Sequence, residues 1–414
     1  MEFNASRLHL PRFRLSVAAD LCVETVSVPS DTSNFAVLEL FTERRDLMSL
    51  PVIEHGRPIG LISRNIFMSQ MSKPFYHEVY GKKSCIAFMD KEPLIVDAAM
   101  SIEALTFRAV ESGEKALADG FIVTRQGALA GVGFGLQLMN VVANMQAEKN
   151  RQIMHSIDYA SVIQRATLRP SQLALSDALD DAHLEWQPRD VVGGDFYHFA
   201  RYDDGWFAAI ADCTGHGVPG AFMTLISSST LTRALQQHGP RDPARLIGAV
   251  NRGVKTMLGQ LDAAATPGVG RGAHESNDGM DAAFMWFDNA SRRLVYAGAK
   301  LALYQLDPSA PAVQSIDGER MGVGYVDTPL DFAWTNKQID VAESSLLLVT
   351  TDGLIDQIGG PKDIAYGKRR MRDLLLSKRT ECANHISQAL LDDFDAWQGE
   401  QPRRDDLTFF CFRP

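Results

Sequence analysis

The sequence lacks the features that mark secreted, membrane-spanning and nucleic-acid-binding proteins. Its five cysteines are scattered without any Cys-x-x-Cys spacing, which argues against a disulfide framework and against a zinc site. No apolar run reaches the roughly 18 residues that a membrane span needs, and the N-terminus lacks the layout of a signal peptide. The net charge of −10 leaves no excess of Lys and Arg for binding nucleic acid. We therefore expect a cytoplasmic protein without a membrane or nucleic-acid partner.

The chain is long enough for two or three domains. It has 414 residues, of which 45% are hydrophobic and 22% are charged, so each half can bury a core. The patterns described below divide it into an N-terminal extension at 1–33, a regulatory pair of repeats at 34–145, a linker helix at 146–170 and a larger domain at 171–414.

Two stretches in the N-terminal part share one pattern. Residues 50–62 and 120–132 each contain a short apolar strand, a turn with Gly and a second short strand, which predicts a β-hairpin. Helix-like segments precede and follow the hairpins at 34–49, 63–71, 95–112 and 136–145. This repeated unit resembles the cystathionine-β-synthase (CBS) domain pair; the alternative is a generic small α/β domain.

The CBS resemblance does not extend to a nucleotide site. CBS pairs often bind adenine nucleotides through a Thr or Ser and an Asp three residues later. Here Ser63 is present but Ile66 takes the acidic position, and Phe134 and Gln137 take the two positions in the second repeat. These departures argue against nucleotide binding and leave dimerisation or protein binding as the roles of the pair.

A long helix is predicted between the two parts of the chain. Residues 136–169 contain neither Gly nor Pro, and their apolar residues recur at steps of three and four. The pattern predicts one helix that ends near Pro170. Its apolar stripe suits either the seam of a homodimer or packing against the helix's own domain.

From about residue 171 short apolar strands alternate with helices. The predicted strands are 206–211, 282–287, 294–297, 346–349 and 407–412. The predicted helices are 221–236, 243–257, 370–377 and 384–397, and residues 263–279 are expected to form a loop. Strands and helices in separate runs indicate an α+β domain built in layers.

Acidic residues stand at the ends of these strands. Asp195 follows two glycines, Asp212 and Asp352 close apolar strands, and Asp405 and Asp406 precede the last strand. Carboxylates that converge without a nearby Lys or Arg repel one another, and a divalent cation relieves that repulsion. Ligands that are all oxygen select Mg²⁺ or Mn²⁺, and two such ions can activate a water molecule for hydrolysis of a phosphate ester.

The order of these motifs resembles that of metal-dependent PPM-type serine/threonine phosphatases. The motifs are Gly-Gly-Asp-Phe-Tyr at 193–197, Asp-x-x-Gly-His-Gly-Val-Pro-Gly-Ala at 212–221, Gly-Met-Asp-Ala-Ala at 279–283, Thr-Asp-Gly at 351–353 and Asp-Asp-Leu-Thr at 405–408. The match covers about residues 155–414 and is to the bacterial branch that controls sporulation, stress sigma factors and biofilm regulators. It implies an α-β-β-α sandwich with two Mn²⁺ or Mg²⁺ ions at one end.

The resemblance also implies a role for each acid. Asp212 is expected to bridge both metals, and the backbone carbonyl of Cys213 is expected to ligate one of them. Asp195, Asp352 and Asp405 are expected to complete the set, with Asp406 as the second choice at the last position. Asp212 and Asp195 are the residues expected to be catalytic.

Three further residues lie near these motifs, and two of them have two interpretations each. Arg189 either meets the substrate phosphate, for which a guanidinium is suited, or is a plain surface residue. His216 is either a general acid or part of a structural Gly-His-Gly turn, and the family favours the turn. Asp281 begins a core strand and is expected to be mainly structural.

The resemblance extends to regulation and partners. Residues 159–170 resemble the switch helix that controls this phosphatase branch, so we expect the CBS-like pair to bias that helix. The family implies a regulatory phosphoprotein of the anti-anti-sigma (STAS) type as substrate, and a homodimer as the assembly. The alternatives are an inactive signalling scaffold with a phosphatase fold and a phosphatase that acts on small molecules.

Overall fold

The structure is a computed structural model that describes residues 17–260 and 277–414. The described chain divides into two compact units, residues 1–153 and 154–414, and each is considered by itself. Residues 1–16 of the predicted N-terminal extension and residues 263–276 of the predicted loop at 263–279 lie outside the described residues.

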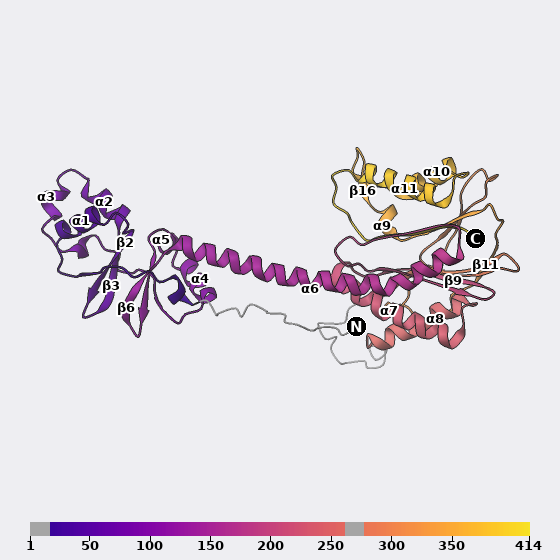
Figure 1. The fold of residues 1–414 in the computed structure, drawn as a ribbon, viewed down its shortest axis with the longest axis horizontal. Coiled ribbons are helices and arrows are strands. Elements are labelled where there is room, and N and C mark those ends of the chain that lie inside the picture. The colour runs from indigo at the N-terminus through magenta and orange to yellow at the C-terminus, as the bar shows by residue number, and fades with distance from the viewer. Residues whose placement is uncertain (1–16, 261–276) are drawn as a thin grey trace, which may run out of the picture. The chain divides into compact units, whose positions relative to one another are not determined.

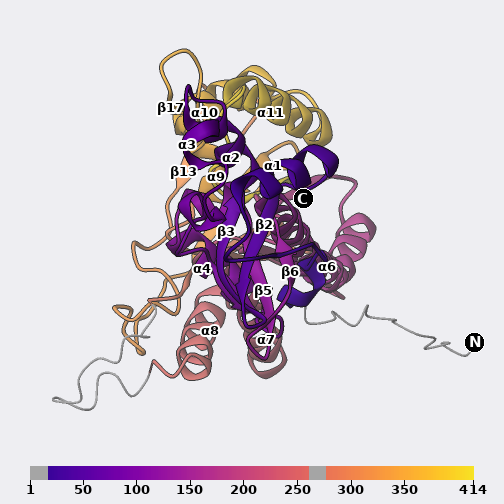
Figure 2. The same ribbon diagram turned by 90° about the vertical axis from the view of Figure 1, so that its left-hand side faces the viewer.

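The first unit contains two copies of one small sheet. Its strands are β1 (Val28–Pro29), β2 (Ser49–Glu54), β3 (Arg57–Ser63), β4 (Ile95–Asp97), β5 (Phe121–Arg125) and β6 (Ala128–Gly133). Each hairpin, β2–β3 and β5–β6, takes a short parallel strand on its outer side, giving the orders β1-β2-β3 and β4-β5-β6. Figure 2 shows the two hairpins beside each other. The predicted internal repeat is therefore confirmed.

The two hairpins use the same turn. The central residues are His55 and Gly56 in the first copy and Gln126 and Gly127 in the second, and all four have positive φ, between 50° and 80°. This is the backbone of a type I′ turn, whose twist matches that of the strands it joins. Glycine at the second position adopts this conformation without strain. This is why a Gly-containing turn in the sequence predicted each hairpin.

The helices of the first unit are short. They are α1 (Asn34–Glu43), α2 (Arg64–Met71), α3 (Tyr76–Tyr80), α4 (Ile102–Glu111) and α5 (Glu114–Ala118), with 3-10 turns η1 (Ala18–Leu21) and η2 (Cys85–Ala87). Ser33 and Ser101 cap α1 and α4 by accepting a backbone N–H three residues on. The predicted helix at 95–112 was wrong at its start, because residues 95–97 pair with β5 and the helix begins only after its Ser101 cap.

The second unit is a sandwich of two five-stranded sheets. The first has the order β14 (Lys337–Asp340), β11 (Arg293–Ala299), β10 (Met280–Asp288), β9 (Gly205–Cys213), β8 (Asp195–Tyr202). The second has the order β13 (Gln314–Ile316), β12 (Leu303–Leu306), β15 (Leu346–Thr350), β18 (Leu407–Arg413), β7 (Asp181–Gln187). A two-stranded ribbon, β16 (Ile358–Gly359) with β17 (Ile364–Ala365), stands apart from both.

Helices cover both outer faces of the sandwich (Figure 1). Helices α7 (Gly217–His238) and α8 (Pro243–Met257) pack on the first sheet, and α10 (Gly367–Ser377) and α11 (Ala383–Gln398) lie over the second. Short helix α9 (Asp352–Ile355) follows β15. The predicted α-β-β-α sandwich is confirmed, and all five predicted strands and four predicted helices of this unit are present with modest changes at their ends.

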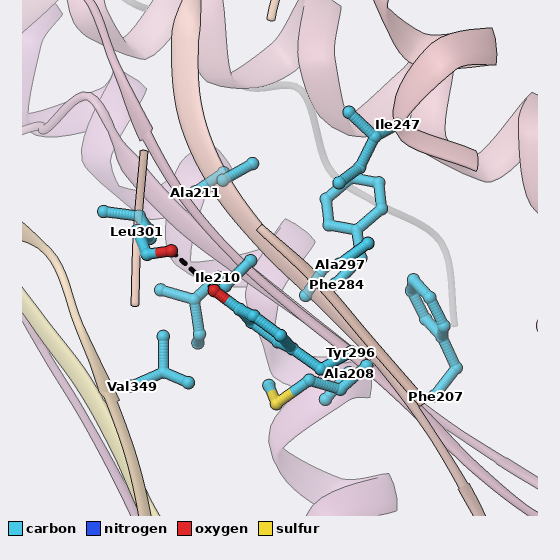
Figure 3. Close-up of a cluster of buried hydrophobic side chains, with 14 of the residues drawn as sticks. Phe207, Ala208, Ile210, Ala211, Ile247, Phe284, Tyr296, Ala297, Leu301 and Val349 are labelled. Atoms are coloured by element: carbon cyan, nitrogen blue, oxygen red, sulfur yellow. Dashed lines mark hydrogen bonds between the residues drawn. The ribbon is translucent and has the colours of Figure 1, made fainter. Parts of the chain in front are cut away.

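The core lies between the sheets because strand residues alternate in direction. Phe410 and Phe412 of β18 face the first sheet, whereas Phe409 and Cys411 join the cluster under α10 and α11. Figure 3 shows the middle of the inter-sheet core, where the buried hydroxyl of Tyr296 donates to the carbonyl of Leu301 over 2.5 Å. This packed interior fixes the strand ends that carry the acidic residues.

The long helix α6 (Gly135–Ala178) continues past its predicted end at Pro170. Proline inside a helix removes one hydrogen bond and costs about 3 kcal/mol. Here Pro170 is exposed, while Leu168 and Leu175 on either side of it are buried in the inter-sheet cluster. Burial of these two side chains offsets the loss, so tertiary packing overrides the local stop signal.

Candidate active site

Strand register brings three aspartates together. Asp195 of β8 lies directly opposite Asp212 of β9, and Asp212 lies directly opposite Asp281 of β10. Residues opposite each other in adjacent antiparallel strands are about 4.5–5.5 Å apart at their Cα atoms and project from the same face. The first sheet therefore presents a row of three carboxyl groups at one end.

The second sheet supplies two more acids at the same place. Asp352 begins α9 directly after β15, and Asp405 lies two residues before β18, the neighbour of β15. Both charges act on Asp212: burial, then Asp195, then Asp352 and Asp405 raise the pKa of its carboxyl. All four acids named as metal ligands by their sequence pattern are thus neighbours in the structure.

Burial and mutual repulsion make the ionised form of these acids costly. Burial, followed by the charge of Asp406, raises the pKa of the fully enclosed Asp195 carboxyl. Burial, followed by the charge of Asp405, raises the pKa of Asp352 to about 6. A carboxyl pKa raised by burial and then by neighbouring carboxylates is typical of a site that a cation would stabilise.

The donor set fits a hard divalent ion. The carboxylate oxygens offer the ligands that Mg²⁺ and Mn²⁺ prefer, and the ammonium of Lys300 pairs with Asp281 over 3.0 Å. As they stand, no three His, Cys, Asp or Glu side chains in the described ranges lie close enough together to chelate an ion. An ion bound here would have to draw the carboxylates closer.

Two glycines allow the loop before Asp195 to approach its neighbours. A Cβ on Gly194 would lie 2.3 Å from the carbonyl oxygen of Gly215 and 2.8 Å from that of Cys213. Such contacts are closer than real side chains tolerate, so the second Gly of the Gly-Gly-Asp motif is required by packing. The backbone N–H of Cys213 also donates to the Gly194 carbonyl over 3.1 Å.

Cys213 offers its backbone rather than its side chain. Its thiol is buried and donates to the hydroxyl of Ser227 over 3.7 Å. Burial raises the pKa of this thiol well above its usual value, so it stays protonated. The carbonyl oxygen, which follows Asp212 at the strand end, is the group that remains suited to a ligand role.

The adjacent acids Asp405 and Asp406 have different surroundings. The carboxylate of Asp406 is buried and accepts the backbone N–H groups of Arg189 over 2.6 Å and Gly194 over 2.5 Å. Asp406 therefore fastens the loop that carries the Gly-Gly-Asp motif. Asp405 is only half-buried, and its charge acts on Asp212 and Asp352.

These residues match a known family. The model of the Stage II sporulation protein E (SpoIIE) family matches residues 202–414, and the CBS domain model matches residues 18–73. The solved PP2C domain of SiaA from Pseudomonas aeruginosa is 36% identical, with a TM-score of 0.56, and the match covers 65% of this chain and 99% of that one. The chain belongs to the SpoIIE family. It is a PPM-type serine/threonine phosphatase with an N-terminal CBS domain, and phosphatases of this type use Mn²⁺ or Mg²⁺.

Two further solved structures are similar to this chain at lower identity. The phosphatase domain with a regulatory fragment of SpoIIE from Bacillus subtilis is 14% identical, covering 56% of this chain and 63% of that one, with a TM-score of 0.43. The RsbU and RsbW domains of Rv1364c from Mycobacterium tuberculosis are 17% identical, covering 57% and 62%, with a TM-score of 0.42. No curated protein matches the chain. No helix in the described ranges has the length and apolar character to cross a bilayer.

The structure of this SpoIIE-family domain shows what Arg189, His216 and Asp281 contact. The guanidinium of Arg189 is exposed and donates to the carbonyl of Arg404 over 3.2 Å. The ring of His216, at the cap of α7, lies 2.8 Å from the carboxylate of Asp190. Asp281 pairs with Lys300 and accepts the hydroxyl of Tyr325 over 3.2 Å, contacts that suit a structural acid.

Gln164 is a site residue that the sequence reasoning missed. It lies on α6, and its buried side-chain amide donates to the carbonyl of Gly193 over 2.7 Å and accepts the N–H of the same residue over 3.2 Å. It also donates to the hydroxyl of Thr224 on α7 over 3.2 Å. Leu168, Ser171 and Leu175 follow Gln164 at helical spacing and are also buried, but no local pattern in the sequence points to its contact with Gly193.

Proposed function

We propose that this protein hydrolyses phosphoserine or phosphothreonine on a regulatory phosphoprotein, with two Mn²⁺ or Mg²⁺ ions bound at the acidic cluster. The observation that carries the proposal is the register of Asp195 and Asp212 together with the convergence of Asp352 and Asp405 on them. Ions bound there would act as Lewis acids and supply an activated water. Asp212 is proposed to bridge them, with Asp195, Asp352, Asp405 and the carbonyl of Cys213 completing the set.

Neighbouring residues are proposed to hold this set in place. The hydroxyl of Thr351 donates to Asp195 over 2.8 Å and also accepts the N–H of Thr408, so it orients the carboxylate from behind. Asp406 is proposed as the anchor of the loop and not as a ligand. Arg189, on that loop, is proposed to contact the substrate phosphate, since a guanidinium matches phosphate geometry.

The first experiment measures hydrolysis of p-nitrophenyl phosphate by the full chain with and without Mn²⁺, for the wild type and Asp212→Ala. Turnover that needs the metal and is lost in the variant supports the proposal. Absence of both turnover and metal binding by calorimetry would contradict it. A panel of nucleotides assayed beside a phosphopeptide separates a protein substrate from a small-molecule one.

We propose that the N-terminal repeats at 34–145 regulate the phosphatase domain at 171–414 through the intervening part of α6. Gln164 supports this route, because any rotation of α6 would remove both of its hydrogen bonds to Gly193, two residues from Asp195. A fragment of residues 155–414 should differ in activity from the full chain. Equal activity under all conditions would count against regulation.

We propose further that the substrate is of the STAS type and that the chain forms a homodimer along α6. Tyr159, Val162 and Ile163 are exposed on this helix, and a second copy would cover them. Light scattering after size-exclusion chromatography tests the assembly, with Val162→Glu expected to give monomers. A purified phosphorylated STAS protein tests the substrate directly.

A further inference from the structure

A groove runs beside the edge strand of the second sheet. It has a volume of about 1050 Å³ and lies between the α6 residues Arg165, Leu168 and Gln172 and strand β7. Five consecutive residues, 183–187, line it. Because alternate strand residues point to opposite faces, a groove lined by consecutive ones follows the edge of the strand and not one of its faces. We call this feature the β7 groove.

The strand beside the groove has an open side. In the described part of the chain β7 pairs with β18 alone, and it ends the sheet order. A second hollow of about 390 Å³ continues the groove along Ala182 and His183 toward Leu175 and Ser176 of α6. An extended peptide can add to such an edge by backbone hydrogen bonds.

The charge of the β7 groove is opposite to that of the protein as a whole. Arg165, Arg189 and Arg403 line it within a chain whose net charge is −10. Its two carboxylates each lie beside an imidazole, Glu185 at 3.0 Å from His183 and Asp190 at 2.8 Å from His216. The guanidinium groups are thus in excess over free carboxylates in the groove.

The arginines are placed to receive a partner. The guanidinium of Arg403 lies over the ring of Phe394, 5.3 Å from its centroid. Asp395, Glu185 and Asp406 are near enough for their charges to act on Arg403, yet within the described residues no acidic side chain forms a salt bridge with it. Arg165 is exposed on α6. A guanidinium that contacts a ring and forms no salt bridge retains N–H groups that can donate to the carboxylates of a partner.

The groove adjoins the acidic cluster through two loops. Arg189 lies on the loop that leads to Asp195 and that Asp406 fastens. Arg403 lies two residues before Asp405. A segment bound in the groove would therefore end close to the proposed metal site, as the flank of a phosphorylated residue must.

We propose that the β7 groove docks an extended acidic segment of the phosphoprotein substrate, which adds to β7 as a strand and pairs its carboxylates with Arg165 and Arg403. This inference rests on the proposed function and specifies the substrate: its phosphorylated residue is flanked by Asp or Glu. The same surface would discriminate against basic flanks.

The test uses the full chain with Mn²⁺ and three phosphoserine peptides of equal length. One has Asp residues in its flank, one has Asn at the same positions, and one has Lys. Anisotropy of the fluorescent peptides measures binding, and phosphate release measures turnover. Wild type should favour the Asp peptide over the Lys peptide by about tenfold or more, as expected for charge-assisted contacts.

Charge reversal separates docking from a general loss of function. Arg165→Glu should abolish or invert the preference between the Asp and Lys peptides, a ratio measured within one variant and so insensitive to the fraction folded. Arg169→Glu, also exposed on α6 but outside the groove, should leave the preference as in wild type. Methylation of alternate backbone nitrogens of the Asp peptide should weaken its binding if it adds as a strand.

The outcomes distinguish the two proposals. Turnover of p-nitrophenyl phosphate with no preference among the peptides, or a preference that Arg165→Glu leaves unchanged, overturns the groove and leaves the phosphatase intact. If the chain neither hydrolyses any phosphate ester nor binds Mn²⁺, the proposed function is overturned and the groove with it. Preference in binding without strand-like sensitivity to N-methylation overturns the strand addition.

Discussion

The two units of the chain differ in what they bury. In the described part of residues 17–153 the buried polar side chains are all neutral: Asn34, Ser49, Ser63 and Thr124. In the described part of 154–414 the buried set also contains charged groups: Asp195, Asp406 and Lys255. Burying a charge costs stability unless it is paired. The first unit avoids that cost, and the second accepts it for Asp195 and Asp406 at the acidic cluster and for Lys255 on α8.

The largest expected effect separates activity from stability at Asp212. Asp212→Asn should reduce hydrolysis of p-nitrophenyl phosphate on the order of 10³-fold, because it removes a proposed metal ligand. In EDTA the same variant should be more stable than wild type by about 1 kcal/mol, since it removes repulsion within the cluster. Urea denaturation checks this, with Asp31→Asn in the first unit as an exposed control.

A lower stability of metal-free Asp212→Asn would show that the cluster is not electrostatically strained. The two units would then differ in which side chains they bury, but not in electrostatic repulsion among those side chains. The exposed control should change the free energy of unfolding by less than about 0.5 kcal/mol.

The next effect distinguishes the adjacent acids. Asp406→Ala should lower the free energy of unfolding by about 2–3 kcal/mol, because it leaves the buried backbone N–H of Gly194 and the part-buried N–H of Arg189 without an acceptor. Asp405→Ala should change stability little in EDTA but abolish metal-dependent turnover. Equal stability losses in the two variants would contradict the assignment of anchor and ligand.

A pair of glycines extends the comparison to the backbone. Gly194→Ala should cost about 2 kcal/mol or more and reduce activity, since its Cβ would meet two carbonyl oxygens. Gly127→Ala, at a positive φ with nothing within 4 Å of its Cβ, should cost only about 1 kcal/mol from conformational strain. Thermal unfolding of both variants measures these costs. The opposite order would show that the loop carrying Gly194 can shift to make room for a Cβ.

The smallest effect is a slope in stability with pH. Because the folded-state pKa of Asp352, about 6, lies above its unfolded value, the folded state binds the extra proton and is stabilised at low pH. The metal-free chain should therefore lose stability as pH rises from about 4 to about 6, and Asp352→Asn should flatten that slope. Saturating Mn²⁺ should reverse the slope, because it binds the ionised form. Denaturation at several pH values, with and without Mn²⁺, measures the slope of the wild type, its flattening in Asp352→Asn and its reversal by the metal.

The sequence was sufficient wherever structure follows from a local pattern. Hairpin turns with Gly, alternating apolar strands and the capped helix α8, whose bounds agree with prediction, are set by residues close to one another in the chain. The placement of Asp195, Asp212, Asp352 and Asp405 at or next to strand ends was also predicted, because each acid stands beside turn residues at the start or end of an apolar strand.

The features that the sequence did not predict depend on contacts between segments distant in the chain. The bond from Asp406 to the Gly194 N–H joins residues 212 positions apart, and Gln164 contacts Gly193 from 29 positions away. Neither is marked by spacing or composition. The continuation of α6 through Pro170 likewise depends on the burial of Leu168 and Leu175, which no local signal reveals.

Pro170 has a consequence for how α6 opens. Without an amide hydrogen it cannot pass on the chain of backbone hydrogen bonds, so the carbonyl of Ala166 has no helical donor. Unwinding that begins near the exposed Tyr159 therefore has no continuous ladder to follow past Pro170 into the segment held by Leu175. In amide hydrogen exchange α6 should behave as two pieces, a fast one before the proline and a slow one after it, so that a single helix responds on two timescales.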